Sequence, residues 1–241
     1  FDNRDAGLST RFAHAGVPNL LWQGFRTHFG FPSEPAYSVQ DMALDALGLL
    51  DALHINRAHV VGMSMGGMIA QRLALQAPER VASLRSIMSS SGAPDLPGPQ
   101  PQVLKAMATP SLKPELEQAI LTMQRLLNLI ASPAEREDPS VVGERLRQAV
   151  QRAYRPTGVL RQTLAVMSDA DRYELLHDIT RPTLVIHGRE DPLLPLPCGE
   201  DTARRIPHAR LQVIDGMGHD FPPGLLQQCL PTLIQFLHEH A

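Results

Sequence analysis

The chain has 241 residues, 43% of them hydrophobic, which is enough for one large buried core with material left for an insertion. Its formal net charge is −3, and lysine and arginine are scattered along it, so neither nucleic acid nor a membrane surface is expected as a partner. No apolar run approaches the roughly 18 residues of a membrane span, and neither the ten histidines nor Cys198 and Cys229 have metal-site spacing, so no metal is predicted. Both cysteines are expected to be free thiols, with a disulfide between them as the alternative.

The first 53 residues read as the end of a strand, a long loop and a helix. Phe1 reads as the last residue of the strand, and a loop rich in glycine, proline and aromatic residues is expected to reach Tyr37. The chain begins without methionine or a leader-like segment, so we expect that its natural start lies upstream. From Ser38 a helix is predicted, with Asp41 completing an acidic capping box. Its apolar face is Val39, Met42, Ala43, Ala46, Leu50 and Leu53.

Residues 58–71 carry the most informative pattern. A β-branched strand meets Gly-x-Ser-x-Gly at residues 62–66, and helical spacing follows. This order predicts a sharp strand-to-helix turn with the Ser64 hydroxyl exposed above the positive end of a helix. Gly62 and Gly66 are expected at positions where a Cβ would collide with the packed strand or helix. The alternative is a Gly/Ser turn without chemistry.

A second strand is predicted at residues 81–88. After it, the alternation of strand and helix patterns stops. Residues 93–178 show helical patterns at 102–108, 114–131, 140–154 and 158–167 and no convincing strand, which is typical of a helical lid. The predicted division is core residues 1–92, lid residues 93–178 and core residues 179–241. Most of the lid's apolar side chains are expected to pack on the core and the rest to line an apolar pocket. They are Met107, Leu121, Met123, Leu126, Leu127, Leu129, Ile130 and Met167.

After the helical segment, strands are again predicted at residues 182–188 and 209–214, and the sequence ends in a predicted helix. Strands alternating with helices predict a parallel sheet covered on both faces, with reactive groups at the carboxyl ends of the strands. Three such ends carry Ser64, Asp191 and His219. A serine hydroxyl needs an imidazole to take its proton, and the imidazole needs a carboxylate to fix its tautomer. The sequence therefore predicts a catalytic triad of these three residues.

Three residues near Asp191 and His219 have side chains of the same chemical types but are less suited to the roles of acid and base. Asp191 is favoured over Glu190 as the acid, because the Glu190 side chain should point to the opposite side. His187 lies inside the end of its strand and is expected to be structural. Asp220 follows His219 too closely to orient it and is expected to tie down its own loop.

These loops resemble the three signature loops of the α/β-hydrolase fold: residues 62–66, 188–192 and 216–219. Residues 1–9 are similar to the family's Asp-x-Arg-Gly-x-Gly-x-Ser loop, with Asp5 in place of the usual glycine. The resemblance covers the whole chain, weakly in the lid. It is closest to the bacterial esterase branch that includes aclacinomycin methylesterase and the cofactor-free haloperoxidases. It implies a mostly parallel sheet, a lid inserted after the sixth family strand, and no cofactor.

One departure from the family concerns the oxyanion hole. The family uses the amide after the nucleophile, here Met65, and a second amide from a loop after its third strand, which this chain lacks. The first three family strands are absent, so the strand at residues 58–62 is expected to be an unpaired edge. We expect a second copy in a homodimer, or a bound N-terminal fragment, to complete the sheet, unless the sequence is a truncated gene product.

The function predicted from the sequence is hydrolysis of carboxylic esters, short to medium acyl or methyl esters, through an acyl-enzyme. The expected partner is a small-molecule ester, and the expected location is cytoplasmic. Two alternatives stay open. The same triad serves C–C bond hydrolases and perhydrolases, and a truncated, inactive fold could act as a binding module.

Overall fold

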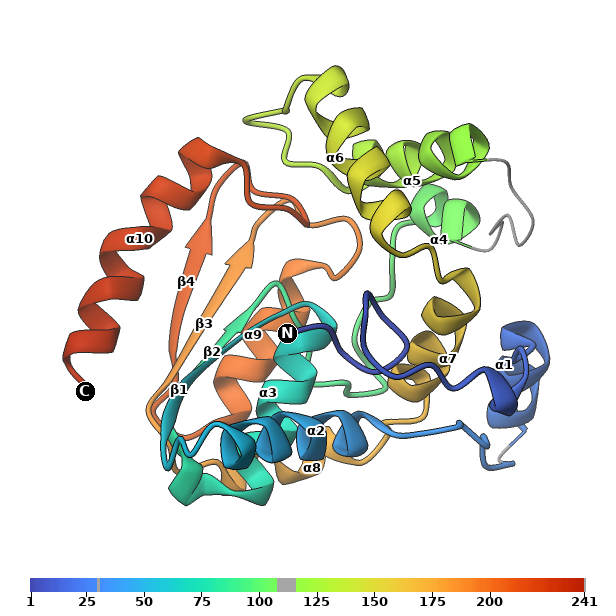
Figure 1. Ribbon diagram of the computed structural model, residues 1–241. Coiled ribbons are helices and arrows are strands. Elements are labelled where there is room, and N and C mark those ends of the chain that lie inside the picture. The colour runs from blue at the N-terminus through green and yellow to red at the C-terminus, as the bar shows by residue number, and fades with distance from the viewer. Residues whose placement is uncertain (30, 108–115, 241) are drawn as a thin grey trace.

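A parallel four-stranded sheet forms the centre of the computed structural model, which describes residues 1–29, 31–107 and 116–240 (Figure 1). The strands lie in the order β1-β2-β3-β4. They are β1 (Ala58–Met63), β2 (Val81–Ile87), β3 (Thr183–Gly188) and β4 (Arg210–Ile214). The four predicted strands in the core are thus confirmed, with ends that differ by one residue at most. Strands β2 and β3 are buried along their whole length, as expected for the middle of a sheet covered on both faces.

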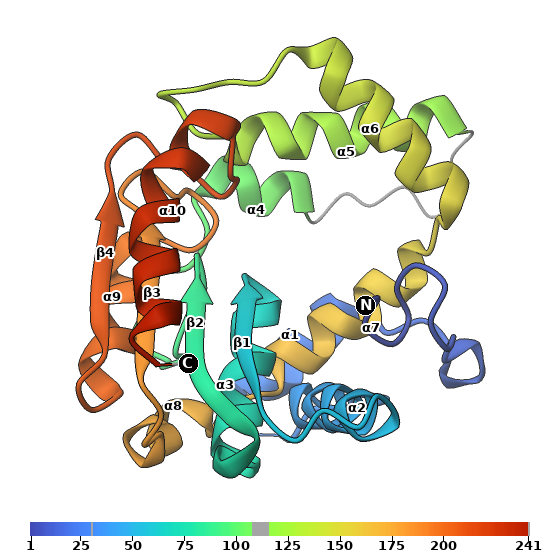
Figure 2. The same cartoon turned by 60° about the vertical axis from the view of Figure 1, so that its left-hand side comes forward.

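Helices cover both faces of the sheet (Figure 2). Helices α3 (Met65–Gln76) and α9 (Leu196–Arg205) pack on one face, with α2 (Val39–Ala52) outside α3, and α10 (Pro223–His238) packs on the other. The other helices are α1 (Leu20–His28), α4 (Pro101–Met107), α5 (Leu116–Ile130), α6 (Pro139–Arg152), α7 (Pro156–Met167) and α8 (Arg172–Leu175), with the short 3-10 helices η1 (Ala13–Ala15), η2 (Pro78–Arg80) and η3 (Leu176–Asp178). The parallel sheet with helices on both faces that the sequence predicts is thus confirmed.

Two apolar clusters hold these layers together. On one face, Met42 of α2 and Ile69 of α3 pack with Leu84 of β2. On the other, Ile186 of β3 packs with Phe236 of α10. Cys198 and Cys229 are both buried and free, as predicted, and form no disulfide.

The start of α2 follows its predicted capping box. The Ser38 hydroxyl accepts from the Asp41 amide at 3.0 Å, and the Asp41 carboxylate accepts from the Ser38 amide at 2.7 Å. The predicted apolar face is buried only in its first half. Leu53, at the other end, is 59% exposed, because it lies beyond the part of α2 that packs on α3.

The outer edge of β1 has no strand partner among the described residues, because β1 ends the strand order. Val61 and Met63 are 55% and 46% exposed there. An apolar edge of this kind offers a row of unpaired backbone groups to any added strand. The sequence-based expectation of an unpaired edge at this strand therefore agrees with the structure.

Two predictions near the N-terminus are wrong. Phe1 lies outside any strand and is 76% exposed. The segment up to Tyr37 is not all loop, since it contains α1, which begins where the Asn19 side chain accepts from the Trp22 amide at 3.0 Å. With nine residues, α1 is too short for its sequence to show a clear helical period, and proline and glycine lie close to it.

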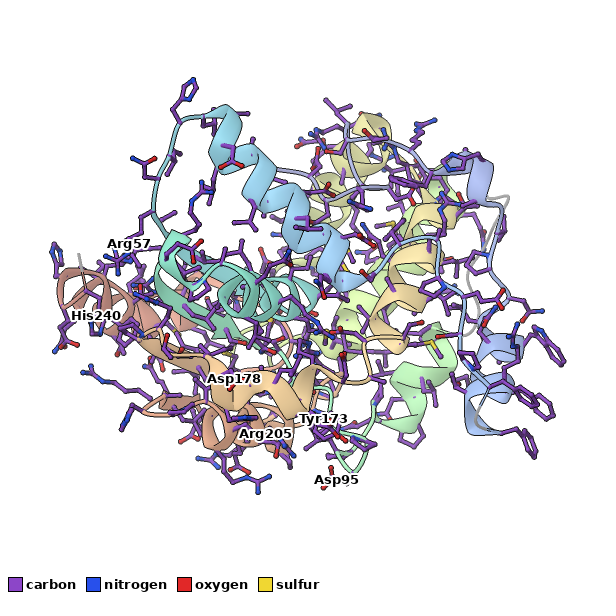
Figure 3. The ribbon with its side chains drawn as sticks, turned by 90° about the horizontal axis from the view of Figure 1, so that it is seen from below. Arg57, Asp95, Tyr173, Asp178, Arg205 and His240 are labelled. Atoms are coloured by element: carbon purple, nitrogen blue, oxygen red, sulfur yellow. The ribbon has the colours of Figure 1, made fainter. Side chains whose placement is uncertain are left out.

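The described residues between β2 and β3 form helices and loops but no strand, and the helices α4, α5 and α6 lie above the carboxyl ends of the strands (Figures 1 and 2). The four helices predicted within the lid correspond to α4, α5, α6 and α7, although the predicted ends Ala108 and Pro114 lie outside the described residues. The short helices α8 and η3 were not predicted from the sequence. On the underside, Arg205 of α9 lies 5.0 Å from the ring centroid of Tyr173 of α8 (Figure 3).

The lid leaves and rejoins the core at neighbouring points. Gly92, just after β2, has a φ of 84°. A Cβ at this position would lie 3.0 Å from Nη2 of Arg172 and 3.6 Å from the carbonyl oxygen of Asp169. The residue that precedes the lid therefore lies beside Asp169 and the start of α8, near the end of the lid.

The N-terminal loop is fastened to α7 by a buried ion pair. Arg161 donates to the Asp5 carboxylate at 2.7 Å and 2.9 Å, and the Tyr37 hydroxyl donates to it at 2.9 Å. Burial raises the pKa of Asp5, but hydrogen bonds from Arg161, the Phe12 amide and Tyr37 outweigh it and lower that pKa from 3.8 to about 2. Asp5, which stands where the resemblance noted above would place glycine, thus joins the N-terminal loop to α7.

We expect Asp5→Asn to destabilise the protein by about 3–5 kcal/mol at pH 7, because it leaves the Arg161 guanidinium buried without its counter-charge. Asparagine keeps the shape and tolerates the φ of 66° at this position. The native pKa lies below the unfolded one, so the carboxylate's contribution is complete above the unfolded pKa and is lost as the pH falls from 3.8 to about 2. Urea unfolding of both proteins at several pH values checks this. A stability difference that stays the same down to the acid end would contradict it.

Candidate active site

Ser64 lies at the turn between β1 and α3, in a strained backbone conformation with φ 53° and ψ −123°. Gly62 makes the turn possible, because a Cβ there would lie 2.0 Å from the Gly66 carbonyl oxygen. The corresponding prediction for Gly66 is wrong, since a Cβ at Gly66 would meet nothing within 4 Å. Gly67 is the second crowded position, where a Cβ would lie 2.6 Å from the Ser89 side chain.

The three residues predicted as a triad lie in one hydrogen-bonded row at the carboxyl edge of the sheet. The Ser64 hydroxyl is 2.9 Å from Nε2 of His219, and Nδ1 of His219 is 2.7 Å from the Asp191 carboxylate. A carboxylate can only accept, so Nδ1 carries a proton and Nε2 is left to accept the hydroxyl proton of Ser64. The His219 side chain is only 7% exposed, which shields this row from water.

Asp191 is held by its own loop after β3. One carboxylate oxygen accepts from the amides of Leu193 and Leu194, both at 2.9 Å, and the other faces His219. Glu190 points elsewhere and accepts from the Gly216 amide at 2.7 Å. The geometry thus brings Asp191, and not Glu190, to the imidazole, as expected from the sequence.

The end of α5 clamps the His219 loop from above. The His219 amide donates to the Ile130 carbonyl at 2.7 Å, and the Gly218 amide donates to the Ser132 hydroxyl at 2.9 Å. Asp220 accepts from both the amide and the hydroxyl of Ser132, so it ties down its loop. Gly218 is required because a Cβ would lie 2.6 Å from the Ile130 carbonyl oxygen. Ile130 was predicted only as an apolar lid residue and Ser132 was not predicted at all, since no local signal pairs either with a loop 86 to 89 residues away.

His187 supports the acid loop from inside the sheet. It is fully buried, and burial lowers its pKa, so the ring is neutral near pH 7. Its Nε2 lies 2.7 Å from the Leu194 carbonyl oxygen and donates to it, while the Leu194 amide donates to Asp191. Gly199 makes room for the ring, because a Cβ there would lie 2.4 Å from Nδ1.

Met65 is the first residue of α3 and follows Ser64 directly. The amides in the first turn of a helix have no partner within the helix, and the helix dipole there favours negative charge. The site thus places such an amide beside the Ser64 hydroxyl. In the part of the chain that the structure describes, no group of three or more His, Cys, Asp or Glu side chains could hold a metal ion. None of the described helices is long and apolar enough to cross a membrane.

Comparison with known proteins bears on the fold and the class of the protein. A family model described as the alpha/beta hydrolase fold matches residues 1–222. The chain is 30% identical over 240 residues to rhodomycin D methylesterase of Streptomyces sp. strain C5, covering 92% of this chain and 74% of that protein. It is 32% identical over 213 residues to the pimeloyl-[acyl-carrier protein] methyl ester esterase of Nitrosomonas europaea, covering 85% and 82%. Among solved structures, a meta-cleavage product hydrolase from Pseudomonas fluorescens IP01 aligns with a TM-score of 0.68 and 26% identity, covering 87% and 75%.

Proposed function

This chain belongs to the α/β-hydrolase fold family, and from that premise we propose that it is a serine hydrolase of carboxylic esters. The family and its relatives indicate a hydrolytic enzyme. The observation that carries the proposal is the continuous row from the Ser64 hydroxyl through His219 to Asp191, with distances of 2.9 Å and 2.7 Å. A serine so placed can lose its proton as it attacks.

The proposed reaction runs in two halves. The Ser64 oxygen attacks the ester carbonyl carbon while Nε2 of His219 takes the hydroxyl proton, and the Met65 amide donates to the oxygen that becomes negative. The tetrahedral intermediate collapses, the C–O bond breaks, and His219 gives its proton to the leaving alcohol. Water, deprotonated by His219, then attacks the acyl-enzyme and releases the acid and the free serine. Throughout, Asp191 stabilises the protonated imidazole.

The proposed substrates are methyl esters and esters of short to medium acyl chains. Support comes from the two relatives named as methyl ester esterases. It also comes from the lid, where five of the eight predicted apolar side chains are more than a third exposed. They are Met107, Leu121, Met123, Leu129 and Met167.

Hydrolysis of p-nitrophenyl acetate and butyrate tests the proposal. We expect the wild-type protein to release p-nitrophenol from both and to be labelled by a fluorophosphonate probe, with the adduct on Ser64 by peptide mass spectrometry. Absence of turnover together with absence of labelling would overturn the proposal and favour the inactive binding module, because an activated serine reacts with the probe whatever its natural substrate.

A second candidate is cleavage of a C–C bond next to a ketone. It is favoured by the similarity to the meta-cleavage product hydrolase structure. The same three side chains would serve, since a hydroxyl attack on a ketone carbon also yields a tetrahedral intermediate that His219 can help to collapse. A substrate panel separates the two, and a kcat/KM that is higher for the ketone than for every ester would replace the first proposal by the second. Hydrogen peroxide added to the ester assay tests perhydrolysis.

A further inference from the structure

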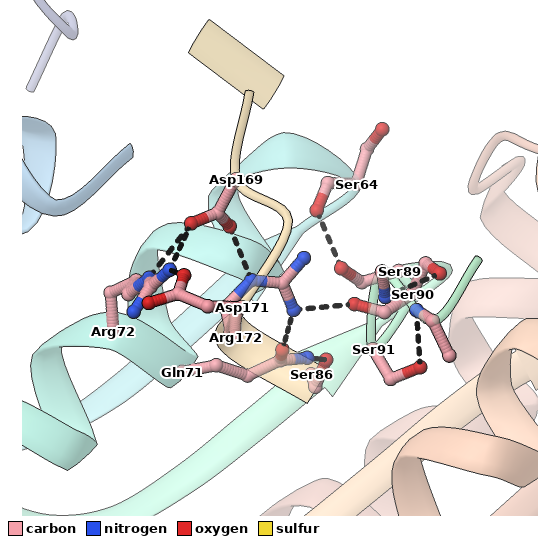
Figure 4. Close-up of polar contacts among 12 residues, drawn as sticks. Ser64, Gln71, Arg72, Ser86, Ser89, Ser90, Ser91, Asp169, Asp171 and Arg172 are labelled. Atoms are coloured by element: carbon pink, nitrogen blue, oxygen red, sulfur yellow. Dashed lines mark hydrogen bonds and ion pairs between the residues drawn. The ribbon is translucent and has the colours of Figure 1, made fainter. Parts of the chain in front are cut away.

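Beneath the Ser64 turn lies a buried serine that the reaction scheme does not use. Ser89 follows β2, is 2% exposed, and donates its hydroxyl proton to the Ser64 carbonyl oxygen at 2.8 Å (Figure 4). That carbonyl also accepts from the Gly67 amide at 2.9 Å and from the Met68 amide at 3.4 Å, both in the first turn of α3. The side chain therefore contacts the backbone of the proposed nucleophile from the far side of the turn.

The carbonyl that Ser89 holds belongs to the peptide group that also carries the Met65 amide. A peptide group is planar and trans, so its C=O and N–H point in opposite directions. A donor that fixes the direction of the Ser64 carbonyl therefore also fixes the direction of the Met65 N–H. Ser64 itself, with a φ of 53° and a ψ of −123°, is strained by about 1–3 kcal/mol, so it keeps this backbone conformation, and with it the orientation of the following peptide, only if its surroundings impose it.

Ser89 is itself held in place from two sides. On one side it is packed against Gly67 of α3, where no side chain would fit. On the other, the next residue is anchored, because Nη1 of Arg172 donates to the Ser90 carbonyl at 2.8 Å. Arg172 in turn donates to Asp169 at 2.5 Å and to Gln71 of α3 (Figure 4). The exit of β2, the end of the lid and the helix after Ser64 are thus joined around this serine.

We propose that Ser89 is a positioning residue that orients the Ser64–Met65 peptide, so that the Met65 amide faces the oxygen on which negative charge develops. This inference rests on the proposed function. Ser89 touches neither substrate nor reacting atoms and acts through the backbone of the two residues that do. Its loss should therefore affect the transition state and leave substrate binding almost unchanged.

Ser89→Ala tests the proposal, with Ser91→Ala as the matched control. Ser91 is also buried in the segment after β2, but its hydroxyl donates to Asp201 of α9 at 2.5 Å. Loss of one oxyanion donor costs about 10²–10³ in rate, so misorienting it should cost about 10- to 100-fold in kcat. We expect that loss in Ser89→Ala with KM changed less than about threefold. Ser91→Ala should keep kcat within about threefold of wild type, although its Tm falls at least as much.

The affinity of a boronic acid that forms a tetrahedral adduct with Ser64 measures the orientation of the Met65 amide independently of kcat. This affinity should fall in Ser89→Ala by about the same factor as kcat and stay unchanged in Ser91→Ala. An unchanged kcat in Ser89→Ala, a change confined to KM, or equal kcat losses in both variants would overturn the proposal, since the last is what a purely structural role predicts.

A crystal structure of Ser89→Ala separates this inference from the proposed function. If the wild-type protein neither turns over esters nor reacts with the fluorophosphonate, the proposed function fails, and the structure alone then decides the inference. Rotation of the Ser64–Met65 peptide away from its wild-type direction supports the orienting role of Ser89. An unrotated peptide rejects it.

Discussion

Ser64→Ala is expected to reduce kcat for p-nitrophenyl butyrate by a factor on the order of 10⁶, the loss that follows removal of a nucleophile from a triad. The residual rate comes from binding and from the oxyanion donor, which alanine leaves in place. Stopped assays over hours, with labelling by the fluorophosphonate probe in parallel, measure the effect. The labelled band should disappear with the turnover.

The stability of this variant provides the control. Alanine and serine share the same preference against a φ of 53°, so the substitution neither adds nor relieves strain at the turn. We therefore expect thermal unfolding of Ser64→Ala to match the wild type within a few degrees. Full turnover in a folded Ser64→Ala protein would reject the proposed mechanism.

Asp191→Asn is expected to lower kcat by about 10⁴-fold while the fold stays intact. The amides of Leu193 and Leu194 require an acceptor, so they hold the asparagine carbonyl oxygen where one carboxylate oxygen now lies. The asparagine NH₂ group then faces Nδ1 of His219, which must accept instead of donate. The imidazole is forced into the tautomer with its proton on Nε2, and this tautomer cannot take the proton of Ser64.

Glu190→Gln is the matched control for that prediction. It makes the same chemical change one residue earlier, at a carboxylate that accepts from Gly216 and does not contact the imidazole. We expect its kcat to stay within about threefold of the wild type. Comparable losses in the two variants would show that the site responds to loop disruption, and would remove the role assigned to Asp191.

The core of the fold was predictable because its signals are local. Strand β3 is a short apolar run that follows Pro182 and ends at Gly188. The segment 58–71 combines a β-branched strand, Gly-x-Ser-x-Gly and a helical pattern within 14 residues. The order of the three loops then placed Ser64, Asp191 and His219 at one sheet edge, where the structure brings them into contact.

The parts of the site that were not predicted depend on contacts between segments far apart in the sequence. Ser132 and Ser89 contact the loops of the site only because the lid and the end of β2 pass beside them, and a serine in a loop carries no sequence signal of such a distant contact. The same reason explains the error at Gly66. Which glycine is crowded depends on the segment that packs against α3, and Ser89 packs at Gly67.

The close contact between the two ends of the lid has a consequence for how members of this family can diversify. Because Gly92 and Arg172 are neighbours in space, the intervening helices form a cassette whose replacement would not require rerouting any strand. Chimeras that graft the lid of a relative between these two residues should therefore inherit the donor's substrate range while retaining the recipient's hydrolytic apparatus, provided that the graft also supplies the contacts made by Ile130, Ser132, Arg161 and Asp169.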